Sequence, residues 1–327
     1  MSISMKSQHV LGWDTKSWGL VLAAIAAIGL LPFLLDQYWL HVSIMILFYI
    51  MMASSWNLLA GYTGQVSLAH AAFAGVGAYT SGILAAKFGL HPLLGLPIGI
   101  LLAAILGLGL GVLCIRMGGI YLTLTTLAFS EIIRLVINNE YEITRGTMGL
   151  QVPFLFGDYS KVTGFYVMMA ATILVLFVIR KILYSDLGQS FRAIQNDEVA
   201  AASVGLPVVR IRVAAFVITA AMAGMAGSIY GHYLLLITPH INSLDMMFLV
   251  LAMAMIGGLG NYSGPIIGAI FLETLAEHIR VWGEFHVFIY GLVALAIVRF
   301  APLGIVGSLT QYIHSRKMRA PEKETAL

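Results

Sequence analysis

Long apolar runs separated by short polar segments dominate the pattern of this sequence. Most of the runs are close to the ~20 residues that an α-helix needs to cross the apolar core of a bilayer. The pattern therefore predicts an all-α polytopic membrane protein with about ten transmembrane helices. The runs lie near 18–35, 40–60, 68–86, 92–115, 119–139, 163–183, 213–236, 244–260, 265–280 and 286–300.

The most prominent polar interruption is residues 187–206, with the sequence LGQSFRAIQNDEVAAASVGL, which we call the polar island. Asn196 or Asp197 suits the N-cap of a helix, because both side chains can accept hydrogen bonds from the first free amides. The acids Asp197 and Glu198 suit the positive end of a helix dipole, and Gly205 suits a C-terminal stop. The island therefore predicts a short helix of about two turns.

Such a short helix needs a surface to stabilise it, because isolated helices of this length are marginal in water. A helix that lies on a membrane would have a strongly basic and apolar amphipathic pattern. Here the apolar side is mostly alanine and includes Ala200, Ala201 and Ala202. The composition therefore favours docking into a groove of another protein.

Lysine and arginine residues orient the chain. If the island is cytoplasmic and the runs alternate, most of the basic residues fall on the cytoplasmic side, as the positive-inside rule requires. Arg134 lies within a span, and the basic residues that fall outside are Lys87, Arg145, Lys161 and Arg280. We therefore expect cytoplasmic segments at 1–17 and 301–327, both termini inside, and a transmembrane domain at 18–300 with a cytoplasmic loop at 184–212.

Composition agrees with the apolar pattern and narrows the function classes. The chain is 60% hydrophobic and 10% charged, with a mean hydropathy of +0.92, whereas a soluble domain is roughly 25% charged. A net charge of +3 without a basic cluster among aromatics predicts no nucleic-acid partner. The single cysteine, Cys114, excludes an internal disulfide and a cysteine-rich metal site.

No spacing of chemistry-bearing residues points to catalysis. The histidines show no HExxH or other paired ligand spacing, and no nucleophile with a base and an orienting group stands out, so we predict no metal site and no catalytic residues. No GxxxxGK[ST] motif occurs either. If the chain uses ATP, another subunit must bind it.

A glycine-rich break follows the second run, in the sequence GYTGQVSLAHAAFAGVGAY at 61–79. Gly61 and Gly64 interrupt the helix, Gln65 and Ser67 sit at the break, and almost every following residue is small. Small residues let neighbouring helix backbones approach closely, so tight packing is favoured on physical grounds. A break that faces a transported substrate remains the alternative.

A second break, GGLGNYSGPIIGA at 257–269, resembles the first in composition. Pro265 suits the first position of the next helix, because its missing amide would be free there anyway. The likeness could reflect an internal duplication. The matched residues are too few to establish one.

A polar stripe runs along the fifth run, 119–139. Its residues follow each other at spacings of three or four, so they share one helix face, and Glu131 lies on the shoulder of that face. A charge in mid-membrane costs ~3 kcal/mol on insertion scales, and pairing between Glu131 and Arg134 offsets part of that cost. The stripe has two possible roles. It could be a structural ion pair with interhelical hydrogen bonds, or it could line a translocation path, and its length slightly favours the second role. The stripe consists of Thr123, Thr126, Ser130, Arg134 and Asn138.

The ninth run carries three charged residues on one face, Glu273, Glu277 and Arg280. They lie near the outer end of the run. We therefore predict a solvated rim there, with a contact surface for an external partner as the alternative.

The motifs together resemble a known family. The stretch RAIQNDEVAAASVGL resembles the "EAA…G" coupling-helix motif of binding-protein-dependent ABC permeases. Glu198, Ala200, Ala201 and Gly205 match it, and Val199 is inserted between the acid and the first alanine. The stretches GYTGQVSLAHAAFAGVGAYT, TRGTMGL (144–150) and GGLGNYSGPIIGA are similar to other segments of the LivM-type branched-chain amino acid permeases.

The resemblance extends over residues 57–272, and several motifs in the right order make it specific. One departure is Ala69, where the family pattern would have glycine, and it puts little in doubt. The resemblance implies a type II permease similar to the vitamin B12 importers, in the bacterial inner membrane. It implies a multi-pass subunit of a high-affinity amino acid importer.

The resemblance also implies partners. A second, LivH-like permease would complete the pore, two ATP-binding subunits would carry ATP and Mg on the inside, and a periplasmic binding protein would deliver the substrate. This chain would bind no cofactor itself. The residues expected to couple to the ATPase are Asp197, Glu198, Ala200, Ala201 and Gly205. Those expected along a translocation path are Gly64, Gln65, Ser67, Thr123, Thr126, Ser130, Glu131 and Arg134.

Two other functions compete with this interpretation. An ion-coupled secondary transporter would work alone, with Glu131 as its proton or cation site. An ABC permease of the same kind could instead serve urea, short amides or other amino acids, because specificity would lie largely in the binding protein. The resemblance itself suggests leucine, isoleucine and valine. A membrane-embedded enzyme lacks any recognisable constellation of residues.

Overall fold

The computed structural model describes residues 15–115, 117–157, 159–279, 304–305 and 307. The fold is almost entirely helical, with one two-stranded ribbon between β1 and β2. The elements are α1 Thr15–Gly29, α2 Leu31–Leu34, α3 Gln37–Thr63, α4 His70–Phe88, α5 Pro92–Leu113, α6 Gly119–Asn139, α7 Tyr141–Thr144, η1 Gly146–Met148, β1 Leu150–Gln151, α8 Lys161–Leu183, α9 Asp186–Asn196, α10 Glu198–Ser203, α11 Val208–Leu234, β2 Leu236–Ile237, η2 Pro239–Asn242, α12 Leu244–Gly257 and α13 Gly264–Ile279.

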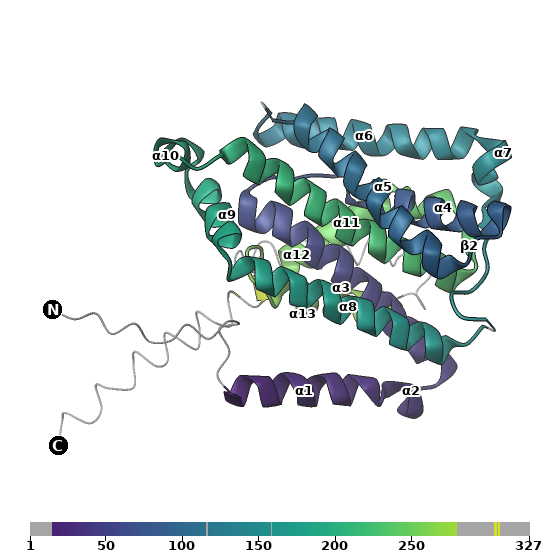
Figure 1. The fold of residues 1–327 in the computed structure, drawn as a ribbon. Helices are drawn as coiled ribbons and strands as arrows, with labels where there is room; N and C mark the ends of the chain where they lie inside the picture. The colour runs from purple at the N-terminus through teal and green to yellow at the C-terminus, as the bar shows by residue number, and fades with distance from the viewer. Residues whose placement is uncertain (1–14, 116, 158, 280–303, 306, 308–327) are drawn as a thin grey trace, which may run out of the picture.

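The long helices lie side by side and form a bundle with two distinct ends (Figure 1). Helices α9 and α10 lie at one end, and α7 and β2 lie at the other. We call these the inner end and the outer end, after the sides that the charge pattern predicts. The polar island and the TRGTMGL segment are therefore separated by the length of the bundle.

Close packing among α4, α5 and α11 forms the centre of the bundle. A β-carbon on Gly77 of α4 would overlap the backbone of Gly224 in α11, and one on Gly227 would overlap the carbonyl of Ala74. Backbones can approach this closely only where side chains are absent. The prediction of tight packing by the small residues of the first break is confirmed.

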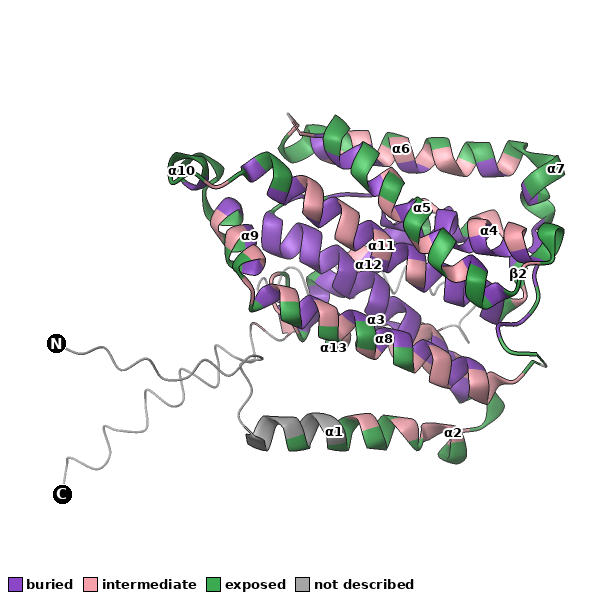
Figure 2. Cartoon of the chain, viewed as in Figure 1, coloured by how far each residue is buried: buried purple, intermediate pink, exposed green. Residues whose placement is uncertain are grey.

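Helix α3 carries much of the buried surface and packs against α8 and α11. Its large side chains Phe48 and Trp56 are almost completely enclosed. By contrast, α5 and α6 show many exposed side chains along their outer faces (Figure 2). These exposed faces are mostly apolar, as expected of helices that contact lipid or a second membrane subunit.

Five of the described helices are long and apolar enough to cross a membrane, namely α3, α5, α6, α8 and α11. Helices α1, α4, α12 and α13 also fall on expected runs. The last expected run, 286–300, lies outside the described residues, so the count of ten spans stays a prediction. A multi-pass helical membrane protein is confirmed in outline.

The structure adds detail to the region of the island. The cytoplasmic loop at 184–212 stays a prediction, and within it α11 already begins at Val208. The island was expected to hold one short helix, but it holds two, α9 and α10, which meet at Asp197. Arg210 and Arg212 made the start of α11 look like a loop in the sequence, although both residues are helical.

The prediction of a solvated rim on α13 is wrong. Glu273 and Glu277 are buried, and the hydroxyl of Tyr38 donates a hydrogen bond to the Glu277 carboxylate. The reason is that α13 packs against α3, which covers this face. The third residue of the set, Arg280, lies outside the described residues.

Candidate functional site

The bend between α9 and α10 is held by the side chain of Asp197. Its carboxylate accepts hydrogen bonds from the amides of Val199 and Ala200, at 2.9 and 3.0 Å. This is the N-cap geometry, in which a side chain satisfies amides that have no partner within the helix. Of the two candidate caps in the sequence, Asp197 is therefore the one used.

The other end of α10 closes at Gly205. This residue has a φ of +85°, a left-handed conformation that glycine adopts without steric cost. The amides of Gly205 and Leu206 donate to the carbonyls of Ala202 and Ala201, at 3.0 and 3.2 Å. The expected C-terminal stop is confirmed, and it turns the chain directly into α11.

The surface of α10 is largely open. Val199 and Val204 are 76% and 79% exposed, and Ala200 and Ala202 are exposed beside them, whereas Ala201 is buried. The helix projects from the inner end of the bundle, as Figures 1 and 2 show. The exposed valines at the start and at the C-cap of this projecting short helix offer apolar surface that suits docking on another protein.

A buried arginine joins this projecting helix to the rest of the inner end. Arg212 of α11 is 8% exposed, and its guanidinium donates to three segments. The acceptors are the carboxylate of Glu198 at 2.8 Å, the side-chain oxygen of Gln65 at 3.2 Å and the carbonyl of Met117 at 2.9 Å. Only an arginine offers donors in a fixed fork to three directions.

The partners of Arg212 make it the centre of the inner end. Glu198 begins α10, Gln65 lies in the break between α3 and α4, and Met117 lies between α5 and α6. Sequence reasoning counted Arg212 only as one more cytoplasmic charge. A signal was present, because an arginine after Pro207 and inside an apolar helix needs buried acceptors.

Helix α9 adds further contacts to the same region of α3. The side-chain amide of Gln195 donates to the carbonyl of Gly61 at 2.7 Å, and the guanidinium of Arg192 lies 5.7 Å from the ring centre of Tyr62. The island therefore contacts the end of α3 through α9, whereas α10 is linked to the following break through Arg212 of α11. A displacement of the island would act directly on the break that follows.

The break after α3 is present at Gly64, but the expected interruption at Gly61 is wrong, because Gly61 lies inside the helix. Gly64 has a φ of +71° and ends the helix, and residues 64–69 run without helical structure until His70. Gln65 and Ser67 are both buried. The indole of Trp56 donates to the carbonyl of Ser67 at 2.7 Å.

The inner part of the α6 stripe supports this non-helical segment. The hydroxyl of Thr123 donates to the carbonyl of Val66 at 3.0 Å, and the hydroxyl of Thr126 accepts from the amide of Leu68 at 2.9 Å. Non-helical backbone inside a membrane protein needs such partners, because lipid offers none. The stripe was expected to form interhelical hydrogen bonds, but at these two threonines the partners are backbone groups of the non-helical segment.

The residues in the outer part of the stripe differ in burial. Ser130 is buried, and its hydroxyl has no hydrogen-bond partner among the described residues. Glu131 and Arg134 form the expected ion pair, in which Nε and Nη2 of the guanidinium donate to the carboxylate, but about a third of each side chain is exposed. This pair lies farther along α6, toward the outer end, than the threonines that contact the break.

The two glycine-rich breaks meet in space. Asn57 of α3 donates its side-chain amide to the carbonyl of Asn261 at 3.0 Å and accepts from the amide of Gly260 at 2.9 Å. Tyr262, in the same loop, donates to the carbonyl of Leu176 at 3.1 Å, and Arg180 lies 5.6 Å from its ring. The inner end thus gathers both breaks and the island.

The comparisons with known proteins identify the family of the chain. Residues 38–298 match the family model for the permease component of the branched-chain amino acid transport system. The chain belongs to this family. It is therefore a membrane permease component of the ABC transporter class, as its helical bundle and its similarity to known permeases indicate.

Several curated relatives belong to both permease types. The high-affinity branched-chain amino acid permease LivM of Escherichia coli K12 is 30% identical over 84% of this chain and 71% of its own length. A probable LivM of Methanocaldococcus jannaschii is 25% identical over 66% of this chain and 70% of its own. The LivH permease of E. coli K12 is 25% identical over 79% of this chain and 91% of its own. No solved structure matches the chain.

Proposed function

We propose that this chain forms half of the membrane pore of an ATP-driven importer for branched-chain amino acids. Family membership supports the permease role, and the LivM relatives support the substrate class. Urea and short amides remain alternative substrates, but the relatives named above are all branched-chain amino acid permeases. The proposed fold has about ten spans, the type II arrangement and both termini inside the cell.

The observation that carries the proposal is the hydrogen-bonding of Arg212. It ties Glu198, at the start of α10, to Gln65, in the break between α3 and α4. A partner that pushes on the exposed valines of α10 would therefore displace the non-helical segment 64–69. Helix α10 and its caps, Asp197 and Gly205, act in this proposal as the docking element for an ATPase.

The translocation path in this proposal follows the break and the α6 stripe. Gly64, Gln65 and Ser67 lie at its inner end, next to Thr123 and Thr126. Buried polar groups without a partner, such as the Ser130 hydroxyl, suit a path that a polar solute passes. A second permease would cover the part-exposed Glu131–Arg134 pair farther along the stripe.

The partners follow from what one chain can supply. A LivH-like permease would complete the pore, since LivH proteins are also similar to this chain. Two ATP-binding subunits would dock on the inner end and hold ATP and Mg. A periplasmic binding protein would deliver the amino acid to the outer end of a complex in the inner membrane.

The rival function, a secondary transporter with Glu131 as its ion site, has less support. The Glu131 carboxylate already accepts two hydrogen bonds from Arg134. A carboxylate whose two oxygens already accept hydrogen bonds from an arginine offers a transported cation a weaker site than a free carboxylate. The stripe is better explained as structure and path lining.

Reconstitution with and without each partner tests the proposal. Proteoliposomes that contain both permeases, the ATP-binding subunits and the loaded binding protein should take up leucine only with ATP on the side of α10. The chain alone, under an ion gradient, should transport nothing. Ion-driven uptake by the chain alone would overturn the proposal in favour of the secondary transporter.

A further inference from the structure

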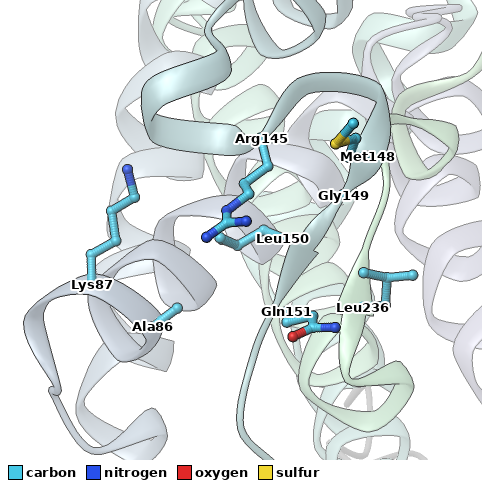
Figure 3. Close-up of a pocket in the computed structure, with 8 residues that line it drawn as sticks. All are labelled: Ala86, Lys87, Arg145, Met148, Gly149, Leu150, Gln151 and Leu236. Carbon is cyan, nitrogen blue, oxygen red and sulfur yellow. The ribbon is translucent and has the colours of Figure 1, made fainter.

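A basic cavity of about 410 Å³ opens at the outer end of the bundle, which we call the outer basic pocket. Its volume lies within the range of roughly 300–1,000 Å³ that small-molecule sites occupy. Figure 3 shows Arg145 and Lys87 on one side of it, Gln151 below, and Met148 and Leu236 opposite. The full lining is Ala86, Lys87, Arg145, Met148, Gly149, Leu150, Gln151 and Leu236.

The backbone that presents Arg145 is fixed from several sides. Arg145 has a φ of +63°, one of two left-handed residues other than glycine in the described chain. The hydroxyl of Thr144 donates to the carbonyl of Ile137 and accepts from the amide of Gly146, which ties this turn to the end of α6. An unfavourable backbone conformation held in this way is a recurrent sign of a binding site.

The pocket carries uncompensated positive charge. Among the described residues, neither Lys87 nor Arg145 forms an ion pair with a carboxylate. The ammonium of Lys87 donates to the main-chain carbonyl of Glu142, and that bond neutralises no charge. Two cations beside a cavity with an apolar opposite wall suit a ligand with one carboxylate and an aliphatic part.

The pocket lies beside a non-helical segment that dips into the bundle. Helix α12 has 14 residues and spans ~21 Å, which is shorter than the ~30 Å apolar core of a bilayer. The chain between α11 and α12 therefore covers part of that depth as β2 and η2. Leu236 of β2 lines both the outer basic pocket and a second cavity of about 110 Å³, whose wall includes Ile241 of η2.

The last residue of η2, Asn242, has a polar side chain without a hydrogen-bond partner among the described residues. Asn242 is 1% exposed, and none of its side-chain amide atoms has a hydrogen-bond partner among the described residues. It lies against Gly75 of α4, where a β-carbon would overlap the amide. Buried polar atoms without partners are uncommon, so they point to a group that the isolated chain lacks.

We propose that the outer basic pocket binds the carboxylate of the amino acid on its way into the membrane. Arg145 contacts the carboxylate in bidentate fashion and Lys87 adds a second positive charge. The aliphatic side chain of the substrate rests on Met148 and Leu236, and Asn242 is the next polar group inward. This inference rests on the proposed function and assigns a first substrate site within it.

The test replaces each cation in the complete transporter. With saturating loaded binding protein, Arg145→Gln should lower maximal leucine uptake about tenfold, the usual cost of a charge-assisted pair. Lys87→Gln should lower it less, about threefold. The affinity of the loaded binding protein for the transporter, measured on nanodiscs, should stay unchanged in both variants.

The matched control is Lys161→Gln. Lys161 also lies at the outer end and donates to a main-chain carbonyl, that of Gln37 at 3.1 Å, but it is not part of the pocket. Its replacement should change neither the maximal leucine uptake nor the affinity of the loaded binding protein for the transporter. Arg145→Gly, which relieves the left-handed conformation, should lose uptake as Arg145→Gln does, and the amount of assembled complex from size exclusion shows that both variants fold.

Each other outcome contradicts the assignment. If Arg145→Gln weakens docking but leaves saturating uptake intact, the pocket receives an acidic side chain of the binding protein and not the substrate. If Arg145→Gln changes neither the uptake nor the affinity of the binding protein, the pocket binds no carboxylate during transport. A wild-type complex that takes up no amino acid with ATP would overturn the proposed function itself, which separates that failure from failure of the pocket alone.

Discussion

At the inner end Arg212 donates to Glu198, Gln65 and Met117, whereas at the outer end Arg145 has no carboxylate partner among the described residues. Arg212 lies within α11, and Arg145 lies in the turn between α7 and η1. The difference in pairing separates two uses of one side chain. A compensated arginine joins structural segments, and an uncompensated one beside a cavity is available to a ligand.

The strongest prediction concerns the contacts of Arg212. Arg212→Met removes three hydrogen bonds, so α10 should detach more easily and trypsin should cleave after Arg192 faster, by about thirtyfold if ~2 kcal/mol of restraint is lost. Cleavage is measured in vesicles that expose the inner end. Arg210→Met, an exposed residue on the same helix, is the control, and equal rates in both variants would contradict the role of Arg212.

The next prediction changes the C-terminal stop of α10. No atom lies near a β-carbon on Gly205, but its φ of +85° disfavours any other residue. Gly205→Leu should cost ~1–2 kcal/mol in this conformation and lower uptake about tenfold without removing the protein from the membrane. Uptake that survives intact, measured in whole cells with the protein level checked by immunoblot, would count against α10 as the coupling element.

A smaller effect is expected on the surface of α10. Val199→Ser with Val204→Ser removes two exposed apolar side chains, so the ATP-binding subunits should bind the permease about fivefold more weakly. Affinity is measured with purified components in detergent. The same change at Leu93 and Leu94, exposed at the far end of α5, is the control. If the affinity falls equally when Leu93 and Leu94 are replaced, the two valines are not a specific docking surface.

The smallest effect is expected at the exposed Glu131–Arg134 pair. Because each side chain is about a third exposed, breaking the pair should change uptake about threefold or less. The double variant Glu131→Gln, Arg134→Gln should recover part of the loss of either single variant, as a double-mutant cycle detects. A complete loss in Glu131→Gln that the second change does not relieve would favour an ion site at Glu131.

Local patterns in the sequence predict much of the helical layout. The polar stripe was expected on a helix over 119–139, and α6 spans Gly119–Asn139. The break at Gly64 and the cap at Asp197 were also visible, because turns and caps depend on the identity of one or two residues. These features need no knowledge of which helices are neighbours.

Features that depend on long-range packing were missed. The start of α11 was placed too late because Arg212 looks like a loop residue until its acceptors, from three other segments, are known. Glu273 and Glu277 looked solvated because the sequence does not show that α13 packs against α3. The outer basic pocket could not be predicted for the same reason. Lys87 belongs to α4 and Arg145 to the turn between α7 and η1, and the sequence does not show that they lie side by side.

The most direct test of the account is the number of leucine molecules transported per ATP hydrolysed by the complete complex in proteoliposomes. Arg212→Met should continue to hydrolyse ATP on its partner subunits but transport about tenfold fewer leucine molecules per ATP than Arg210→Met. A ratio that is equal in the two variants would contradict the claim that Arg212 carries the movement of α10 to the break at Gln65.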